Sequence, residues 1–479
     1  MRHYFRVLGA ALTALGITAA LAADPPPQVK LGRIASTFEQ LRVTELADQL
    51  IRYLGTVVQW VDRPETRLPL QSLTPKIRQA VLAHPEVRLV QTQRETAALA
   101  SREAFAGFLP QASANLESSR RGFDRVSTPQ SFVPAYVDNS KALALSARQM
   151  VYDFGAVSNQ VQSRTSLESA AAARSESKTS ELTLRALTAW LELFRGQQTL
   201  TVTQMNVLSR QQILFFIDER EKLGGSPQSD VLRARARLAD AQVAAVVAKN
   251  RLTAAEAVYR EIFNEAPPAQ LQVPEVAPLA MDRYQNPTDW LSRSAHLAEA
   301  RAQTQAAGYE AKSAAAALLP SLFLDLSVRR RDLGSQGVAG SDWTAGFVLK
   351  QNLYSGGAEL ARQRQAEQRA IESQLGEDNL KRQLERSFAQ AIADVQNSTA
   401  AVAARKEAVQ VAALALEAVR EQFAFRRGTL LDLLRAQEEL YIAGREMIDG
   451  VVDHALVRYR LLHLASDLNP LFDIPPPNQ

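Results

Sequence analysis

The feature that most constrains this chain is one very long stretch whose sequence favours a helix throughout. Residues 156–223 contain no proline, and Leu193, Leu200, Val207 and Leu214 recur every seven positions. At 1.5 Å per residue, about 68 residues of helix extend for roughly 100 Å. No single globular domain accommodates such a rod. The chain must therefore form a fibre, a coiled-coil shaft or the wall of a tall assembly.

The same seven-residue repeat returns in three further segments. A regular apolar stripe at this spacing imposes left-handed supercoiling of a helix against its neighbour. We therefore expect a second long helix over 358–425 and shorter return helices over 228–264 and 429–466. Their stripes are Phe388, Val395, Val402, Val409, Leu416 and Phe423; Val231, Leu238, Ala245, Leu252 and Tyr259; and Leu433, Leu440, Met447, His454 and Leu461.

Turns of similar position end both long helices. The first turn, 224–227, reads GGSP, and its Gly224 and Gly225 can adopt positive φ, while proline cannot continue a helix. The second turn, 426–429, reads RRGT, and its Thr429 is an N-cap for the following helix. Each long helix is therefore expected to belong to a helical hairpin.

The organisation of the chain is a duplication, the first thing to look for in a sequence of this kind. The segment YDFGA at 152–156 returns as YSGGA at 354–358, and DVLRA at 230–234 returns as DLLRA at 432–436 at the same separation. We expect a signal peptide over 1–22, an N-terminal extension over 23–73, a first repeat over 74–264, a proline-rich connector over 265–287, a second repeat over 288–468 and a tail over 469–479. The repeats contain strands at about 110–121 and 140–151, and at about 319–331 and 342–353, before long helices at 156–223 and 358–425.

The strand pairs allow two interpretations. Leu322, Leu324 and Leu326 alternate with polar residues, and Phe347 and Leu349 do the same in the next strand, which is typical of strands with one apolar face. The two pairs could be ordinary soluble hairpins. They could instead cross a membrane, but four strands cannot close a water-filled barrel and lipid does not tolerate an open edge. In the membrane interpretation, several copies must pool their strands.

The N-terminus predicts export. Arg2 and Arg6 precede an apolar stretch over 7–21, and residues 20–22 (ALA) form a small-residue cleavage signal, which together indicate a secretory signal peptide. The alternative, a membrane anchor, needs nearer twenty apolar residues. In the extension that follows, Phe38, Leu41, Leu50, Leu54 and Val58 suggest one amphipathic helix without an identifiable role.

Composition argues against an enzyme and against a nucleic-acid partner. The chain has no cysteine, which excludes a lipid-modified N-terminus and disulfide bonds, and its net charge is only +4 before the signal peptide is removed. No two of its five histidines have the i, i+4 spacing of a helical metal site. His454 occupies a stripe position, which favours a packed or lumen-facing side chain over a ligand. We expect no active site, cofactor or metal.

Over about Thr74 to Leu468 the chain resembles the TolC family of outer-membrane efflux and secretion channels. The resemblance rests on Leu-Pro at 109–110 and 319–320, YSGG at 354–357, and GTLLDLLRAQEEL at 428–440, and the last motif is most similar to members that serve type I secretion. It implies a mainly α fold of two tandem repeats, assembled as a homotrimer. The trimer would carry a twelve-stranded membrane β-barrel above a periplasmic α-helical tunnel.

The resemblance also implies a periplasmic gate at the helical turns. Asp432 matches the first of two aspartates that ring the entrance in the family prototype, but Arg435 occupies the second position. Phe423 stands where the prototype has a tyrosine that helps to close the gate. An ordinary surface ion pair between Asp432 and Arg435 is the alternative. The candidate gate residues are Gly224, Gly225, Asp230, Arg233, Phe423, Arg427, Gly428, Thr429, Asp432 and Arg435.

Function is therefore expected to be transport. An outer-membrane duct would receive cargo from an inner-membrane transporter, of ABC type for type I protein secretion, through a periplasmic adaptor protein. Outer-membrane lipid would surround the strands. Small-molecule or multidrug efflux is the alternative cargo. A soluble periplasmic coiled-coil adaptor or scaffold is a more remote alternative, since an adaptor would carry one hairpin and not two in tandem.

Overall fold

A computed structural model of the chain describes residues 49–61, 67–123, 126–128, 131–133, 136–273, 275, 279, 281–284, 286–331, 340–425 and 427–475. The expected signal peptide at 1–22 and the expected helical positions Phe38 and Leu41 lie outside these residues. None of the helices that the structure describes is long and apolar enough to span a bilayer.

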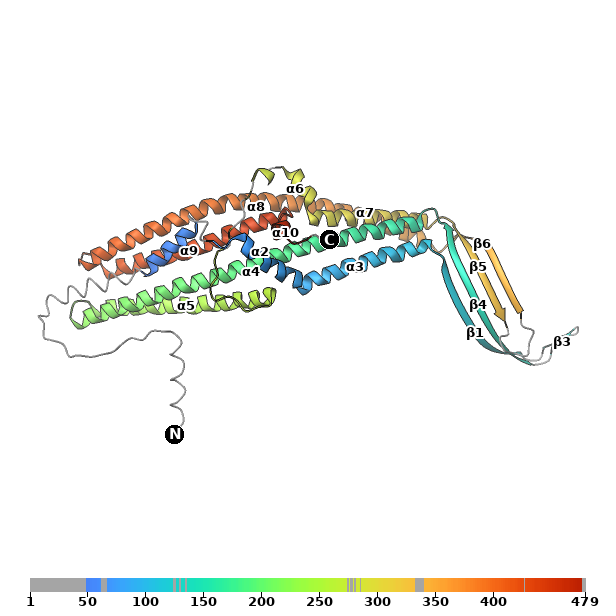
Figure 1. The fold of residues 1–479 in the computed structure, drawn as a ribbon, viewed down its shortest axis with the longest axis horizontal. Helices are drawn as coiled ribbons and strands as arrows, with labels where there is room; N and C mark the ends of the chain where they lie inside the picture. The colour runs from blue at the N-terminus through green and yellow to red at the C-terminus, as the bar shows by residue number, and fades with distance from the viewer. Residues whose placement is uncertain are drawn as a thin grey trace, which may run out of the picture.

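Two helical hairpins dominate the molecule (Figure 1). The first pairs α4 (Ala156–Lys222) with α5 (Gln228–Phe263), and the second pairs α8 (Ala358–Ala424) with α9 (Leu430–Leu464). α9 also packs on α4, so the helices follow one another across the wall in the order α8, α9, α4, α5. Toward the sheet, α7 (Ala295–Ala316) lies between α8 and α4, and α3 (Pro85–Phe105) lies on the other side of α4.

The expected heptad stripes of α8 and α9 face the helical contacts, whereas in α4 only Leu193 of the four expected stripe residues is buried. All six expected stripe residues of α8, from Phe388 to Phe423, are buried, as are Leu433, Leu440, Met447 and Leu461 of α9. His454 is half-buried between α8 and α9, with its Nδ1 atom 3.0 Å from the hydroxyl of Ser398. The wall is therefore held together by coiled-coil packing.

Left-handed glycines set the directions in which the long helices leave the sheet. Gly155 has φ 91° and precedes α4, and Gly357 has φ 81° and precedes α8. A side chain is disfavoured in this conformation. The Asp153 carboxylate accepts hydrogen bonds from the Gly155 and Val157 amides, at 3.0 and 2.6 Å, which satisfies free donors at the start of α4.

The strands form one antiparallel sheet in the order β1, β4, β5, β6. These are Gln111–Phe123, Tyr136–Tyr152, Ser321–Arg331 and Gly340–Lys350, and a separate small hairpin pairs β2 (Val126–Thr128) with β3 (Ser131–Val133). The pairing of β4 with β5 joins the two halves of the chain, with an irregularity between Met150 and Tyr152. The sequence indicated each strand pair but not this link between them.

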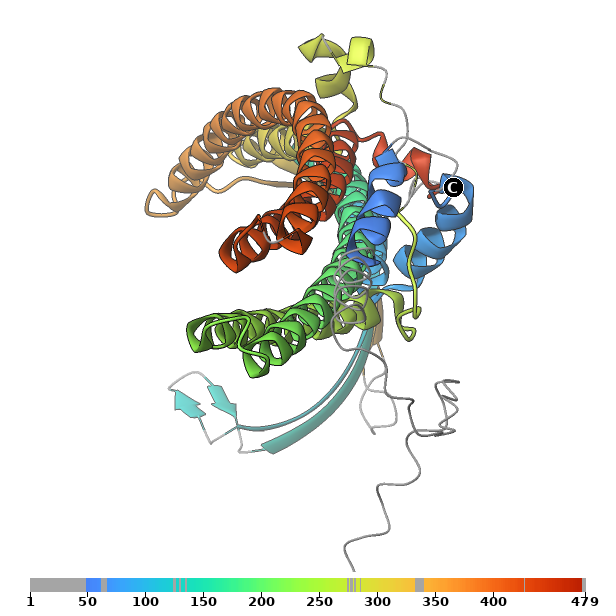
Figure 2. The same ribbon diagram turned by 90° about the vertical axis from the view of Figure 1, so that its left-hand side faces the viewer.

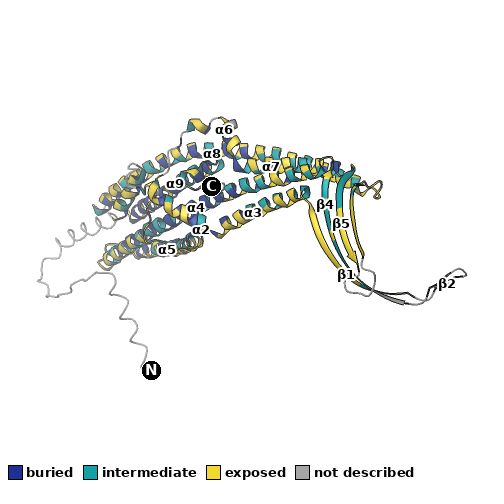
Figure 3. Cartoon of the chain, turned by 45° about the vertical axis from the view of Figure 1, so that its right-hand side comes forward, coloured by how far each residue is buried: buried dark blue, intermediate teal, exposed yellow. Residues whose placement is uncertain are grey.

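The polar face of the sheet is marked by two cross-strand contacts. The hydroxyl groups of Ser113 and Ser146 lie 2.8 Å apart, and Arg148 makes a bidentate ion pair with Asp325, with N–O distances of 2.6 and 2.7 Å. Leu322, Leu324 and Leu326 alternate with Asp325 and project from the opposite face. None of the strand residues whose burial is described is buried, and Figure 3 colours β1, β4 and β5 as exposed or intermediate.

The remaining elements gather around the middle of the wall. Residues 49–61 form a helix with Leu50, Leu54 and Val58 buried, and α2 (Leu70–Ala83) follows it. The connector forms backbone hydrogen bonds with Leu68, which lies between these two helices. Leu68 N–H donates to the Val273 carbonyl and Glu275 N–H donates to the Leu68 carbonyl, each at 2.8 Å. α6 (Pro287–Arg293) and α10 (Leu468–Leu471) complete this region. Figure 2 shows the wall as an arc, with α2 and α10 on its convex side.

Candidate functional site

The helical turns form one end of the molecule, the end remote from the sheet (Figure 1). In the first turn, Gly225 N–H donates to the Arg220 carbonyl at 2.8 Å and the Arg220 Nε donates back to the Gly225 carbonyl at 3.0 Å. In the second turn, the amides of Arg427 and Gly428 both donate to the Gln422 carbonyl, at 2.8 and 3.1 Å. Both turns are thus closed by their own backbone.

Asp432 and Thr429 form a reciprocal capping box at the start of α9. The Asp432 amide donates to the Thr429 hydroxyl oxygen at 3.2 Å, while the Asp432 carboxylate accepts from the Thr429 hydroxyl at 2.6 Å and from the Thr429 amide at 3.3 Å. The hydrogen bond from the Thr429 hydroxyl, followed by that from its amide, lowers the pKa of Asp432, and the positive charge of Arg435 adds a smaller effect. This carboxylate therefore has a structural partner.

An ion pair between an aspartate and the arginine three residues later is present in the first hairpin but not in the second. Among the described residues, no ion pair within 4 Å joins Asp432 to Arg435, whereas the Arg233 guanidinium lies 3.8 Å from Asp230 in α5. The two hairpins therefore use the same Asp-x-x-Arg spacing differently. In α9 the aspartate caps the helix, and in α5 it pairs with the arginine one turn later.

Phe423 joins the two hairpins near the turns. Its ring is buried and meets Phe216 of α4 edge-on, with 6.1 Å between ring centroids, and the Arg220 guanidinium lies 5.7 Å above it. A phenyl ring has no hydroxyl, so apolar packing and a cation–π contact hold this position. Phe423 is therefore a candidate gate residue that contacts the other hairpin directly.

A buried arginine that the sequence analysis did not select also ties α4 to α9. The Arg210 side chain is 1% exposed and donates to the Leu434 carbonyl at 3.2 Å and to Glu438 at 2.8 Å. Next to it, Gln437 donates to the Ser209 hydroxyl at 3.0 Å. Arg210 lies three residues after the stripe residue Val207, at the second apolar position of the heptad, so a charge in the seam was the available signal.

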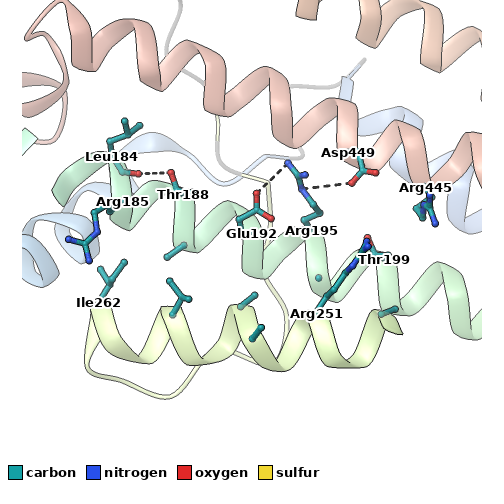
Figure 4. A pocket seen from close by; sticks show the side chains of 16 residues that line it. Leu184, Arg185, Thr188, Glu192, Arg195, Thr199, Arg251, Ile262, Arg445 and Asp449 are labelled. Atoms are coloured by element: carbon teal, nitrogen blue, oxygen red, sulfur yellow. Dashed lines mark hydrogen bonds and ion pairs between the residues drawn. The ribbon is translucent and has the colours of Figure 1, made fainter. Parts of the chain in front are cut away.

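A hollow of about 720 Å³ lies between α4, α5 and α9, about halfway along the wall (Figure 4). Arg195 of α4 occupies it and donates to Asp453 at 2.6 Å, while Glu192 and Asp449 lie 3.4 and 3.8 Å from its guanidinium nitrogens. Burial raises the pKa of both Glu192 and Asp449. Arg185, Arg251 and Arg445 also line the hollow, so four arginines and two carboxylates interrupt a lining that is otherwise largely apolar.

Neighbouring side chains of α4 beside the hollow point in different directions. On α4, Phe194 and Gln198 contact Trp60 and Tyr53 of the N-terminal helix, whereas neighbouring Arg195 points to α9. The Arg195 side chain therefore points toward α9 and not toward the N-terminal helix. Within the described residues no group of three or more potential metal ligands occurs.

A curved wall of paired helices and a terminal sheet define the fold, and comparisons with known proteins show what the chain is similar to. Residues 286–450 match the outer membrane efflux protein family. The efflux protein BepC of Brucella suis is 23% identical over 281 residues, and the alkaline protease secretion protein AprF of Pseudomonas aeruginosa is 27% identical over 312 residues. These alignments cover 58% and 62% of this chain, and 62% and 63% of the relatives, so the chain spans less than two thirds of their length.

Solved structures show the same fold. The outer membrane protein VceC of Vibrio cholerae superposes with a TM-score of 0.73 at 18% identity, covering 83% of this chain and 96% of VceC. The CmeC channel of Campylobacter jejuni gives 0.73 at 14% identity, covering 83% and 86%. The chain is therefore similar to members of the outer membrane efflux protein family and shares the fold of these solved structures.

Proposed function

We propose that the protein is one subunit of an outer-membrane channel that gives an inner-membrane transporter an exit from the cell. The observation that carries this proposal is a protomer whose sheet and helical wall both end in open apolar edges. A single copy cannot satisfy these edges, but a ring of copies can. The concave face of the arc would then line the duct.

The sheet supplies the first pair of edges. β1 and β6 are the outer strands, and β6 exposes Trp343, Phe347 and Leu349 by 77%, 71% and 68%. Unpaired backbone groups are costly in lipid, so spanning sheets must close into barrels. β5 and β6 each contain 11 residues, enough to cross a bilayer at the usual tilt. A homotrimer would pool its strands into a twelve-stranded barrel.

The two end helices of the wall supply the second pair of open edges. Its end helices, α5 and α8, expose rows of apolar side chains on the sides away from α4 and α9. Contacts between the α5 edge of one copy and the α8 edge of the next are head-to-tail, and such contacts close into rings. The exposed residues are Leu232, Val243, Val246 and Val247 in α5, and Leu360, Ile371, Leu375, Val411 and Leu414 in α8.

For cargo, we infer type I protein secretion, with a periplasmic adaptor and an ABC transporter as partners. Two of the curated relatives, AprF and PrtF of Dickeya chrysanthemi, are protease secretion proteins. BepC is described as an efflux protein, so small-molecule efflux is the second candidate. The GTLLDLLRAQEEL segment at 428–440, which forms the second turn and the start of α9, favours secretion.

Membrane fractionation followed by native gel electrophoresis in mild detergent tests the channel proposal. We expect the protein in the outer-membrane fraction, as an oligomer with three times the protomer mass. A monomer in the soluble periplasm would refute the proposal.

A deletion strain of the source organism separates the two cargo classes. Loss of the gene should remove specific proteins from the culture supernatant without changing drug susceptibility. Increased drug susceptibility with an unchanged supernatant would favour efflux and overturn the secretion assignment.

A further inference from the structure

The apolar face of the sheet carries charge at one end only. Register places Arg120 of β1, Lys141 of β4 and Arg330 of β5 on the same face as Leu143 and Leu324. They lie beyond Leu116, Leu143 and Val328 of their own strands, toward the end of the sheet that is remote from the helices (Figure 1). We call these three residues the outer basic row.

Register also separates the acidic side chains from this row. In the strand register, Asp325 lies opposite Arg148 and Asp342 lies opposite Arg329, and all four positions belong to the polar face. Glu117 lies opposite Ala142 on the same face. Among the described strand residues, the apolar face therefore contains basic groups and no acidic one. The three side chains of the row are exposed, and in the described part of the chain none of them forms an ion pair.

The neighbours of the row indicate what kind of molecule would meet it. Arg330 lies opposite Leu143 and two residues after Val328, and Val328 lies opposite Trp343, which is 77% exposed. Tryptophan is enriched where the hydrocarbon region of a membrane meets the polar headgroups. A ligand on this face would therefore present hydrocarbon to Val328 and Trp343 and negative charge to Arg330.

We propose that the outer basic row binds the phosphorylated headgroup of a glycolipid in the outer leaflet of the membrane. The inference rests on the proposed function, since it requires the sheet to cross the outer membrane. Guanidinium groups pair with phosphate oxygens in a bidentate fashion, and basic residues next to a membrane-spanning segment attract anionic lipid. The occupant is amphipathic because the row is continuous with a lipid-facing apolar surface. A soluble phosphate would gain nothing from that surface.

The test uses the full oligomer in lipid nanodiscs that contain either bis-phosphorylated lipid A or the same lipid after removal of its phosphates. Retained lipid per protein is measured by native mass spectrometry. Wild type should retain the phosphorylated lipid preferentially, and Arg330→Gln should reduce that retention about fivefold, with a similar further loss for Lys141→Gln, as expected for about one surface charge each. Added salt should weaken the preference.

Arg329→Gln is the matched control. Arg329 is the next residue in β5 but faces the polar side, opposite Asp342. This change should leave lipid retention unaltered. Equal retention of the two lipids by wild type, or equal loss in the Arg329 and Arg330 variants, would overturn the inference. Failure of wild type to enter nanodiscs as an oligomer would instead refute the channel proposal, and this inference with it.

Discussion

Leu54 lies directly against the backbone of Gly444 in α9. A Cβ atom at position 444 would come within 2.5 Å of one Leu54 methyl carbon and 2.8 Å of the other. The Leu54 side chain is 1% exposed, and nearby Trp60 packs edge-on against Phe194 of α4, with 5.2 Å between ring centroids. The helix at 49–61 therefore spans the seam between α4 and α9, and is part of the core.

The first prediction follows from this contact. Gly444→Ala should lower the free energy of unfolding by about 1–3 kcal/mol, because Leu54 has little room to move and overpacking strains the core. Glycine to alanine in a helix interior would otherwise stabilise by about 1 kcal/mol. Thermal unfolding of the detergent-solubilised protein measures the difference.

Gly376→Ala in α8 is the control, because a Cβ atom there meets nothing within 4 Å. It should raise stability slightly. Leu54→Ala combined with Gly444→Ala should recover part of the loss, giving a measurable coupling energy. If Gly444→Ala behaved like Gly376→Ala, the contact would not be tight.

The sequence was most informative where structure repeats locally. Heptad spacing predicted α4 from Ala156 to within one residue of its end at Lys222, and the six stripe residues of α8 are all buried. Strand ends were less accurate: β4 begins at Tyr136, before the expected start at about 140, and β6 ends at Lys350, before 353. Periodicity specifies which face is buried, but strand ends depend on the partner strand.

Long-range contacts were the part that the sequence did not reveal. Arg148 and Asp325 form their ion pair across the joint between the two halves, and no local pattern links residues so far apart. The buried role of Arg210 could have been predicted, since it is a charged residue at an apolar heptad position. The role of Arg195 could not, because its acidic partners Asp449 and Asp453 lie far away in the sequence, on α9.

The second prediction concerns the two faces of β5. Leu324→Arg should prevent assembly in the membrane, because a basic residue on a lipid-facing surface costs about 2–4 kcal/mol at mid-depth. Ser327→Arg changes the polar face, where Ser327 lies opposite Ser146 and Thr344, and should be tolerated. Yield of heat-modifiable oligomer in the outer-membrane fraction compares them. Equal tolerance of both substitutions would remove the membrane assignment of this strand.

The third prediction is a loss of stability in mild acid. Burial, and then the positive charges of Arg458 and Arg67, lower the pKa of His454 to about 4, and burial also lowers the pKa of His463 to about 4. Both histidines are therefore neutral in the folded state but take up protons near pH 6.5 when unfolded. Each neutral histidine contributes on the order of 1–3 kcal/mol to the free energy of unfolding. This contribution is complete above pH 6.5 and is lost as the pH falls toward 4.

Chemical denaturation at pH 7, 5.5 and 4.5 measures this dependence. The variant His454→Gln can still accept from or donate to Ser398, which lies 3.0 Å from the imidazole, and should show a shallower decline. Adding His463→Gln should flatten it further. An unchanged slope in the double variant would assign the acid sensitivity to carboxyl groups.

The last prediction separates the capping role of Asp432 from a role in the gate. Thr429→Ala removes the N-cap hydroxyl and should lower stability by about 1 kcal/mol without changing the charge at the turn. Asp432→Asn keeps an acceptor oxygen for Thr429 but removes the negative charge. In a trimer, three copies of Asp432 and three of Asp230 would surround one axis, where crowded carboxylates attract cations. Asp432→Asn should therefore reduce cation selectivity and multivalent-cation block in single-channel recordings, while Thr429→Ala should not.

Asp230→Asn should have a weaker effect, because Arg233, 3.8 Å away, already offsets its charge. If Asp432→Asn and Thr429→Ala lost stability equally and both conducted like wild type, the Asp432 carboxylate would serve α9 alone. The gate would then lie at the contact of Phe423 with Phe216 and Arg220.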